Sequence, residues 1–266
     1  MSVVTGRVER LREKLEANQP ALGVMPTLGS ELAVETYGWA GFDYVMVDFE
    51  HGSTDLSKIE NLVRAAEVSG MSALARVWSH DPWILTKALD TGVMGLVVPF
   101  VNSVEQAEAI VSATRYPPVG TRGSCPAMRV ARDHYMHGGY RAYIEAAGNP
   151  LVIAMIETVQ GLEAVEEIAQ VEHIDGLFFG PADFTLSSGV SLDSLSQDEV
   201  VRARDRVRDA AKRAGKIVME NAFTPQDVVE SLQAGAGMSI CATDSLALGQ
   251  AARQFVDGVV AEVRGR

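Results

Sequence analysis

The chain has 266 residues, 47% of them hydrophobic, which is enough apolar material for one large core. Its 35 acidic and 23 basic residues give a formal net charge of −12, which argues against nucleic acid as a partner, because gripping a phosphate backbone requires a basic surface. No apolar run approaches the roughly 20 residues of a membrane span, and the N-terminus lacks the apolar core of a signal peptide. We therefore expect one cytoplasmic domain over residues 1–266, with no membrane partner. Its two cysteines, Cys125 and Cys241, form no CxxC pair, and we expect both to be reduced.

Eight apolar runs of strand length recur along the chain. Such continuous hydrophobicity, without polar alternation, is typical of strands that are buried on both faces. The runs begin near residues 21, 44, 72, 95, 151, 176, 216 and 238, with the sequences ALGVMP, YVMVDFE, SALARV, GLVVPF, LVIAMIE, GLFFGP, KIVMEN and MSICATD.

Helical spacing fills most of the gaps between these runs, as in residues 53–70, 102–115, 198–215 and 224–235, and several of these stretches end at glycine. Strand and helix in alternation predict parallel strands, and eight such units in about 250 residues predict an α/β fold of the (β/α)8 TIM barrel type. A doubly wound open sheet is the alternative. It more often carries a GxGxxG turn after its first strand, and PTLGSEL is not one.

Residues 115–150 interrupt this alternation. The segment is rich in Gly, Pro and Arg, is too long for an ordinary connection, and follows what already looks like a complete helix. We interpret it as a functional loop over one end of the barrel. Arg122, flanked by Gly120 and Gly123, is expected to reach into the barrel mouth and bind an anionic substrate. For Arg129 and Arg132, ion pairs with carboxylates of a neighbouring subunit are the favoured interpretation.

Polar residues gather where the apolar runs end. In a barrel the carboxyl ends of the strands converge on one mouth, which is where barrel enzymes carry out their chemistry. Each residue alone can also be a solvated strand end, and this applies most to Glu50, Glu220 and Asn221. The set consists of Asp48, Glu50, His51, Arg76, Glu157, Asp183, Glu220 and Asn221.

Glu157 and Asp183 come from different strand ends and form an oxygen-rich pair. A histidine is expected nearby, and no thiolate is. Such a pair suits a hard divalent cation such as Mg²⁺ or Mn²⁺. With Arg76 beside it, a cation would suit a 2-oxo acid, because the metal chelates the oxo and carboxylate oxygens and the arginine neutralises charge. A pair of carboxylates can equally act as general acid and base without metal, as in glycosidases.

Several stretches resemble signatures of the HpcH/HpaI aldolase family, the metal-dependent class II pyruvate aldolases, and they occur in that family's order. They are DYVMVDFEHG, ARVWSHDPWILTKALDTGVMGLVVPFVNSVEQAE, SATRYPPVGTRG, MIET and IDGLFFGPADFTLSSG. The resemblance covers nearly the whole chain. It implies a barrel of the phosphoenolpyruvate/pyruvate type whose C-terminal helix packs on, or is swapped with, a neighbouring subunit in a trimer or a hexamer built as a trimer of dimers.

The resemblance also implies site residues. Glu157 and Asp183 would ligate a divalent cation (Mg²⁺, Mn²⁺ or Co²⁺), and His51 would be the general base. Three further roles are implied by the resemblance. Arg76 would stabilise the enolate, Asp90 would raise the basicity of His51, and Ala182 with Asp183 would touch the substrate. One position departs from the pattern, because Met155 stands where many relatives have a glutamine that could bond the oxo acid.

The function expected is reversible aldol cleavage of a 4-hydroxy-2-oxo acid to pyruvate, or a related 2-oxo acid, and an aldehyde. A metal-dependent 2-oxo acid decarboxylase of the oxaloacetate type is an alternative, because it shares the enolate. A barrel that binds carboxylic acids without catalysis is an alternative of another class. The C-terminal stretch DSLALGQAARQFVDGVVAEVRGR has apolar positions at helical spacing and no later chain to cover them, which predicts a homo-oligomer.

Overall fold

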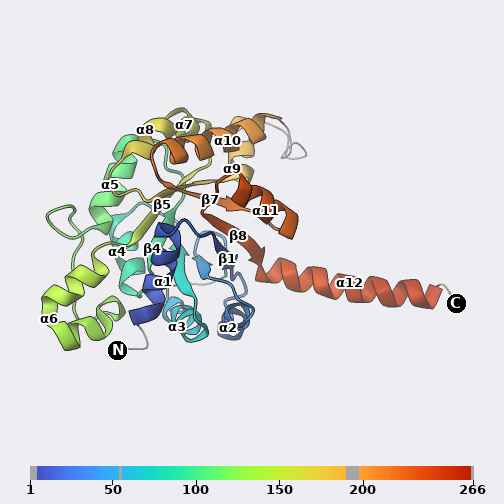
Figure 1. The fold of residues 1–266 in the computed structure, drawn as a ribbon, viewed down its shortest axis with the longest axis horizontal. Coiled ribbons are helices and arrows are strands. Elements are labelled where there is room, and N and C mark those ends of the chain that lie inside the picture. The colour runs from blue at the N-terminus through green and yellow to red at the C-terminus, as the bar shows by residue number, and fades with distance from the viewer. Residues whose placement is uncertain (1–4, 54–55, 190–197, 265–266) are drawn as a thin grey trace.

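The computed structural model describes residues 5–53, 56–189 and 198–264. Within these residues eight parallel strands close into one barrel, each strand bonded to the next in chain order and β8 to β1 (Figure 1). The predicted (β/α)8 barrel is confirmed, and all eight apolar runs are strands. They are β1 (Ala21–Met25), β2 (Tyr44–Asp48), β3 (Ser72–Arg76), β4 (Gly95–Val98), β5 (Leu151–Ile156), β6 (Gly176–Phe179), β7 (Ile217–Asn221) and β8 (Met238–Thr243).

The helices surround this barrel and follow the start and stop signals of the sequence. Asp81 caps the helix that begins at Pro82, Thr224 and Asp227 form a reciprocal capping box, and Gly70 ends a helix in the left-handed region at φ 92°. The helices are α1 (Thr5–Glu16), α2 (Glu31–Trp39), α3 (Ile59–Ser69), α4 (Pro82–Asp90), α5 (Val104–Thr114), the 3₁₀ turn η1 (Arg129–Ala131), α6 (Arg132–Ala147), α7 (Val159–Glu163), α8 (Val165–Gln170), α9 (Pro181–Ser188), α10 (Asp198–Arg213), α11 (Pro225–Gln233) and α12 (Asp244–Arg264).

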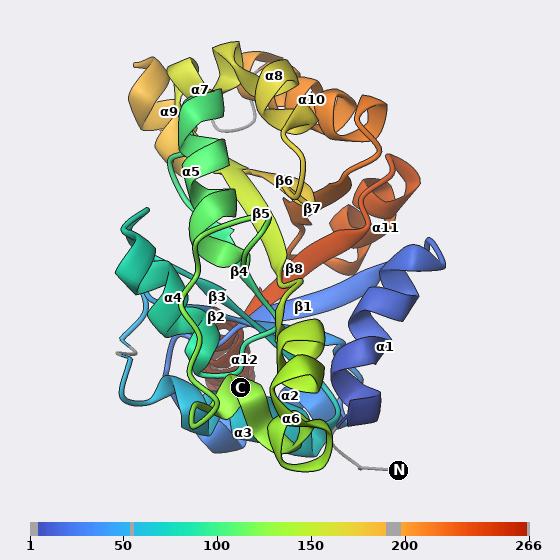
Figure 2. The ribbon, with the colours of Figure 1, turned by 90° about the vertical axis from the view of Figure 1, so that its left-hand side faces the viewer.

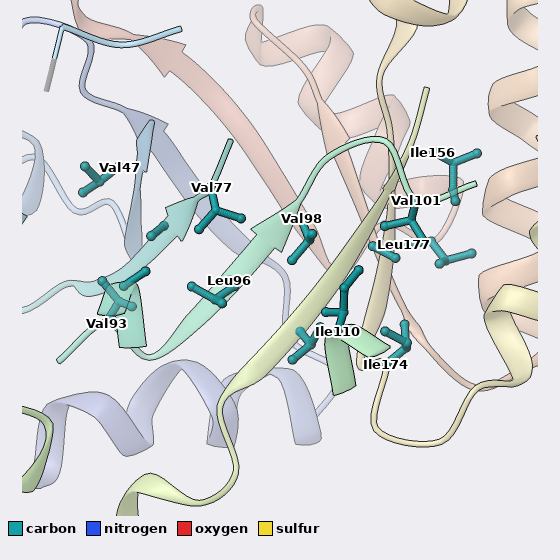
Figure 3. Close-up of a cluster of buried hydrophobic side chains, with 14 of the residues drawn as sticks. Val47, Val77, Val93, Leu96, Val98, Val101, Ile110, Ile156, Ile174 and Leu177 are labelled. Atoms are coloured by element: carbon teal, nitrogen blue, oxygen red, sulfur yellow. The ribbon is translucent and has the colours of Figure 1, made fainter. Parts of the chain in front are cut away.

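Side chains of each strand alternate between two buried layers. In β2, Tyr44 and Met46 point into the barrel, whereas Val45 and Val47 belong to the larger cluster between the strands and the helices (Figure 3). Leu11 of α1 joins the interior layer, so that this helix closes the end of the barrel where the strands begin. Both faces of the strands are therefore dry, which explains their continuous hydrophobicity.

Residues 115–150 lie at the end of the barrel where the strands begin, opposite to the mouth. Arg115 donates a hydrogen bond of 2.6 Å to the carbonyl of Pro150, the residue immediately before β5. The N–H of Leu151 donates to the carbonyl of Met94, the residue immediately before β4. The segment contains η1 and α6, and α6 lies next to α1 (Figures 1 and 2). The segment therefore covers one end of the barrel, but not the mouth, because a segment that leaves the end of a helix lies at the end of the barrel where the next strand starts.

The C-terminal helix α12 projects away from the barrel (Figure 1). Of its residues only Asp244 is fully buried, and Leu248, Phe255 and Val263 are more than half exposed. No described helix is both long and apolar enough to cross a bilayer.

Candidate active site

A buried ion pair joins the ends of β2 and β3. Asp48 and Arg76 are register partners in the sheet, and both point into the barrel. Arg76 donates from Nε to Asp48 Oδ1 at 2.8 Å and from Nη2 to Asp48 Oδ2 at 2.7 Å, the two-pronged arrangement that a guanidinium favours with a carboxylate. Burial alone raises the pKa of Asp48, but the hydrogen bonds and charge of Arg76 outweigh it and lower that pKa below its usual value. The guanidinium is thus fixed in position beneath the mouth.

Glu50 and His51 extend this pair toward solvent. Glu50 Oε2 lies 3.3 Å from Nη1 of Arg76 and 3.9 Å from Nε2 of His51. The Glu50 side chain is 10% exposed, and its partial burial raises its pKa despite the nearby charges of Arg76 and His51. The side chain of His51 is 64% exposed. His51 therefore stands at the rim, where a substrate that enters the mouth can meet its ring.

Glu157 lies immediately after β5 and is fully buried. Its Oε1 accepts a hydrogen bond of 2.8 Å from the backbone N–H of Phe100, and its Oε2 has no hydrogen-bond partner among the described residues. Burial raises the pKa of Glu157 to about 7, and the negative charges of Glu50 and Asp183 add to this effect, while Phe100 N–H and Arg76 oppose it. A buried carboxylate oxygen without a partner is costly unless something supplies positive charge to it.

Two backbone features hold Glu157 in place. Phe100, whose N–H binds the carboxylate, has φ 53°, a left-handed conformation that is rare for a bulky residue and recurs at functional sites. Gly180 follows β6, the strand beside β5, and a Cβ at this position would stand 2.6 Å from Glu157 Oε2. Only glycine leaves room for the carboxylate there. Neither residue was predicted from the sequence, because phenylalanine gives no signal for a left-handed backbone and the glycine precedes an ordinary helix start.

Asp183 is in the first turn of α9, which follows β6 directly. Its charge acts on both Glu157 and Glu50, so that the three carboxylates lie within electrostatic reach of one another. Carboxylates this close repel unless a cation is shared between them. Of the described residues, no group of three His, Cys, Asp or Glu side chains has the spacing of a metal cage. Glu157 and Asp183 remain the candidate pair for an open site, in which substrate and water would provide the other oxygens.

Two further predicted residues surround this pair. Ala182 is exposed, one position before Asp183. Met155 is in the interior layer and 3% exposed, and its methyl carbon lies 2.7 Å from the position that a Cβ on Gly180 would occupy. Met155 therefore shares the inward face of β5 with Glu157, as its spacing predicts, and packs beneath the carboxylate as part of the floor of the site.

Asp90 and Arg122 are not at the mouth. Asp90 is the last residue of α4, at the end of the barrel where strands begin, and its Oδ1 accepts a hydrogen bond of 3.1 Å from Nη2 of Arg122. Within one chain, Asp90 is thus bonded to Arg122 and not to His51. The expectation that Arg122 reaches into the mouth is wrong, because its backbone is bonded to Arg115 at the foot of the barrel.

The remaining candidates have structural contacts. Within one chain, Arg129 and Arg132 both pair with Glu67. Glu220 faces outward from β7, where it accepts hydrogen bonds from Arg208 and Ser231. Asn221, the next residue, is exposed at the end of the strand. Both Cys125 and Cys241 are free thiols.

A comparison with known proteins agrees with this geometry. The family model described as HpcH/HpaI aldolase/citrate lyase matches residues 27–248. A 2-dehydro-3,6-dideoxy-6-sulfogluconate aldolase of Pseudomonas putida is 34% identical over 198 residues, which cover 71% of this chain and 76% of the relative. A 5-keto-4-deoxy-D-glucarate aldolase of Klebsiella pneumoniae is 34% identical over 208 residues, covering 78% and 79%.

Solved structures give the same result. The crystal structure of an HpcH/HpaI aldolase/citrate lyase family protein from Burkholderia cenocepacia is 31% identical, with a TM-score of 0.84 over 95% of this chain and 98% of that one. The matched region includes every strand after β1 and all the residues gathered at the mouth. The relatives are named as aldolases, which agrees with the carbon–carbon lyase class expected from the sequence. The chain belongs to the HpcH/HpaI aldolase/citrate lyase family.

Proposed function

We propose that the protein is a metal-dependent aldolase that cleaves a 4-hydroxy-2-oxo acid to pyruvate, or a related 2-oxo acid, and an aldehyde. The observation that carries this proposal is Oε2 of Glu157, which is buried, lacks a partner among the described residues, and lies within electrostatic reach of Asp183. Carboxylate oxygens are the ligands that hard divalent cations prefer, and Glu157 with Asp183 would hold Mg²⁺, Mn²⁺ or Co²⁺. When bound, such a cation polarises the oxo and carboxylate oxygens of a 2-oxo acid and stabilises negative charge on the oxo oxygen.

Arg76 supports the same chemistry. Its Nε and Nη2 are bonded to Asp48, so that the guanidinium cannot swing away, and its Nη1 lies 3.3 Å from Glu50 Oε2. A positive charge held in a buried position is preorganised to stabilise an anion that forms during the reaction. Arg76 would therefore orient the substrate carboxylate and stabilise the enolate.

His51 is suited to the proton transfer. In the cleavage direction the bond between C3 and C4 breaks, the electron pair stays on C3 as the enolate, and the proton of the C4 hydroxyl must leave. An imidazole at the exposed rim can accept that proton and return it in the reverse reaction. Glu50 Oε2 lies 3.9 Å from Nε2 of His51, so a carboxylate stands beside the ring that would carry the proton.

The test uses His51→Ala. His173→Ala is the control, because His173 precedes β6 at the end of the barrel opposite to the mouth, where its carbonyl accepts a hydrogen bond from Arg115. With Mn²⁺ present, we expect His51→Ala to reduce pyruvate release from a 4-hydroxy-2-oxo acid by roughly 10²–10⁴-fold, the usual contribution of a general base. Oxaloacetate decarboxylation, which needs no base for a hydroxyl proton, should fall far less. Retention of aldol cleavage in His51→Ala would contradict the assignment, and decarboxylation without any aldol cleavage in the unmodified protein would favour the decarboxylase alternative.

A further inference from the structure

The His51 turn, residues 49–53, is held to the rest of the barrel at two places. The first is Asp48 at the end of β2, whose Oδ1 accepts a hydrogen bond of 3.5 Å from the N–H of His51. Gly52 folds back so closely that an added Cβ would stand 2.2 Å from the carbonyl oxygen of Asp48. The second is Ser53, whose hydroxyl donates to the carbonyl of Thr27 at 2.8 Å. The far end of the turn therefore rests on the connection between β1 and α2.

Thr27 is in turn bonded to the start of α12. Asp244, the first residue of that helix, accepts hydrogen bonds at Oδ1 from the N–H and the hydroxyl of Thr27, at 2.7 and 2.8 Å. The hydroxyl of Ser245 lies 2.8 Å from that of Thr27. Asp244 is 3% exposed, and hydrogen bonds to an ionised acceptor are stronger than those between neutral groups. A continuous chain of hydrogen bonds thus runs from α12 through Thr27 to Ser53, two residues from His51.

The ring of His51 depends on this turn for its position. Its side chain is 64% exposed, and its ion-pair contact among the described residues is Oε2 of Glu50, 3.9 Å from Nε2, which is longer than a hydrogen bond. Within one chain, Asp90 is at the other end of the barrel and does not orient the ring. A general base must come within hydrogen-bond reach of the proton that it removes. The backbone of the His51 turn therefore decides how well the ring meets a substrate hydroxyl.

We propose that Thr27 is a positioning residue for the proton transfer at His51. It joins the His51 turn to the start of α12, through Ser53 on one side and Asp244 on the other. The inference rests on the proposed function, in which His51 accepts the proton of the C4 hydroxyl. It also connects the active site to the helix that projects from the barrel with its apolar residues exposed (Figure 1). A displacement of the first turn of α12 would reach His51 through these side-chain contacts.

The test measures pyruvate release from 4-hydroxy-2-oxopentanoate with Mn²⁺ present. Ser53→Ala removes the hydroxyl that reaches Thr27, and Thr27→Val removes the hydroxyl that reaches α12, so each variant breaks one link of the chain. In each we expect kcat to fall about threefold to tenfold, because a displaced base transfers the proton less well, while KM stays within about twofold. The affinity for Mn²⁺, measured by calorimetry, should not change. Thr27→Ser keeps the hydroxyl and should retain most of the activity.

Two controls show whether the effect passes through His51. Ser69→Ala also removes a hydroxyl that donates to a backbone carbonyl at 2.8 Å, but at the end of α3 away from the mouth, and should keep full activity. In the His51→Ala background, Ser53→Ala should cause no further loss, because the group that it positions is gone.

Three results would overturn the inference: an unchanged kcat in both Ser53→Ala and Thr27→Val, an equal loss from Ser53→Ala with and without His51, or a parallel loss of Mn²⁺ affinity, which would show a merely structural role. Failure of the unmodified protein to cleave any 4-hydroxy-2-oxo acid would instead remove the proposed function, and this inference with it.

Discussion

Glu157 shows how much of this site depends on backbone rather than on side chains. Its carboxylate is fixed by a backbone N–H from a strained phenylalanine and by the missing side chain of Gly180. A carboxylate held in this way can stay close to the charge of Asp183 and does not turn toward another hydrogen-bond donor. The position of the candidate cation ligand is therefore set by two residues that carry no charge.

The first prediction concerns Gly180→Ala. The added methyl would lie 2.6 Å from Glu157 Oε2 and 2.7 Å from Glu157 Cβ, and the Cβ cannot move without its strand. We expect a loss of stability of about 1–3 kcal/mol from overpacking, and at least a tenfold weaker affinity for Mn²⁺, both measurable by calorimetry. Gly123→Ala is the matched control, because nothing lies within 4 Å of a Cβ at that position. Equal Mn²⁺ affinity in the two variants would show that Gly180 does not position Glu157.

The second prediction concerns Asp48→Asn, which leaves Arg76 without its bidentate partner. At neutral pH we expect the free energy of unfolding to fall by roughly 1–3 kcal/mol, because a buried guanidinium loses its charge-assisted acceptor, although Glu50 stays close. The pKa of Asp48 is lowered by folding, so its contribution is present above the usual aspartate pKa of about 3.9 and is lost as the pH falls through the lower folded value.

The stability difference between the two proteins should therefore shrink in acid below about pH 4, where the unmodified Asp48 also becomes protonated. Chemical denaturation at several pH values measures it. A difference that stays constant with pH would mean that the ion pair does not stabilise the fold.

Among the elements, α9 and α12 serve different purposes. Helix α9 begins with Pro181 and places Asp183 in its first turn, where the partial positive charge of a helix N-terminus favours a carboxylate. Helix α12 differs from the helices that surround the barrel, because it projects away and its apolar residues are exposed (Figure 1). An apolar face of this kind on a long helix needs cover, and a second copy of the chain would provide it.

The third prediction is that the protein is a homo-oligomer assembled partly through α12. Phe255 and Val259 are 75% and 48% exposed, lie four residues apart, and share one face of the helix. Phe255→Asp with Val259→Asp should shift the protein to smaller species in multi-angle light scattering. Gln250→Asp, which adds a charge on the other side of the helix, should leave the mass unchanged. A stable, active monomer in the unmodified protein would contradict the prediction.

At the scale of the whole molecule, the barrel could be predicted from sequence because its signals are periodic. Eight apolar runs and the helices between them follow directly from hydrophobic spacing. The mouth was also predictable in outline, since Asp48, Arg76 and Glu157 end or follow strands. Glu220 was harder to place, because adjacent strand residues point to opposite faces and only the register decides which one points inward.

Other features depend on tertiary structure that the sequence does not show. Arg122 was misplaced because a conspicuous Gly- and Arg-rich segment suggested a loop at the mouth, whereas its position after α5 puts it at the opposite end. The left-handed backbone of Phe100 and the close approach to Gly180 arise from packing around Glu157. A backbone conformation or a close approach of this kind has no local sequence signal, because the residue types involved are common elsewhere.

The most direct test of the account is the exchange of pyruvate methyl protons with deuterium from solvent, followed by proton NMR. It requires only that the mouth bind a 2-oxo acid and form its enolate, so the unknown aldehyde does not matter. We expect exchange that depends on Mg²⁺ or Mn²⁺ and is abolished by Glu157→Gln and by Asp183→Asn, while Glu172→Gln, at a surface carboxylate, exchanges normally. Complete absence of exchange with Mg²⁺, Mn²⁺ and Co²⁺, or exchange that persists at the same rate in Glu157→Gln, would contradict the account.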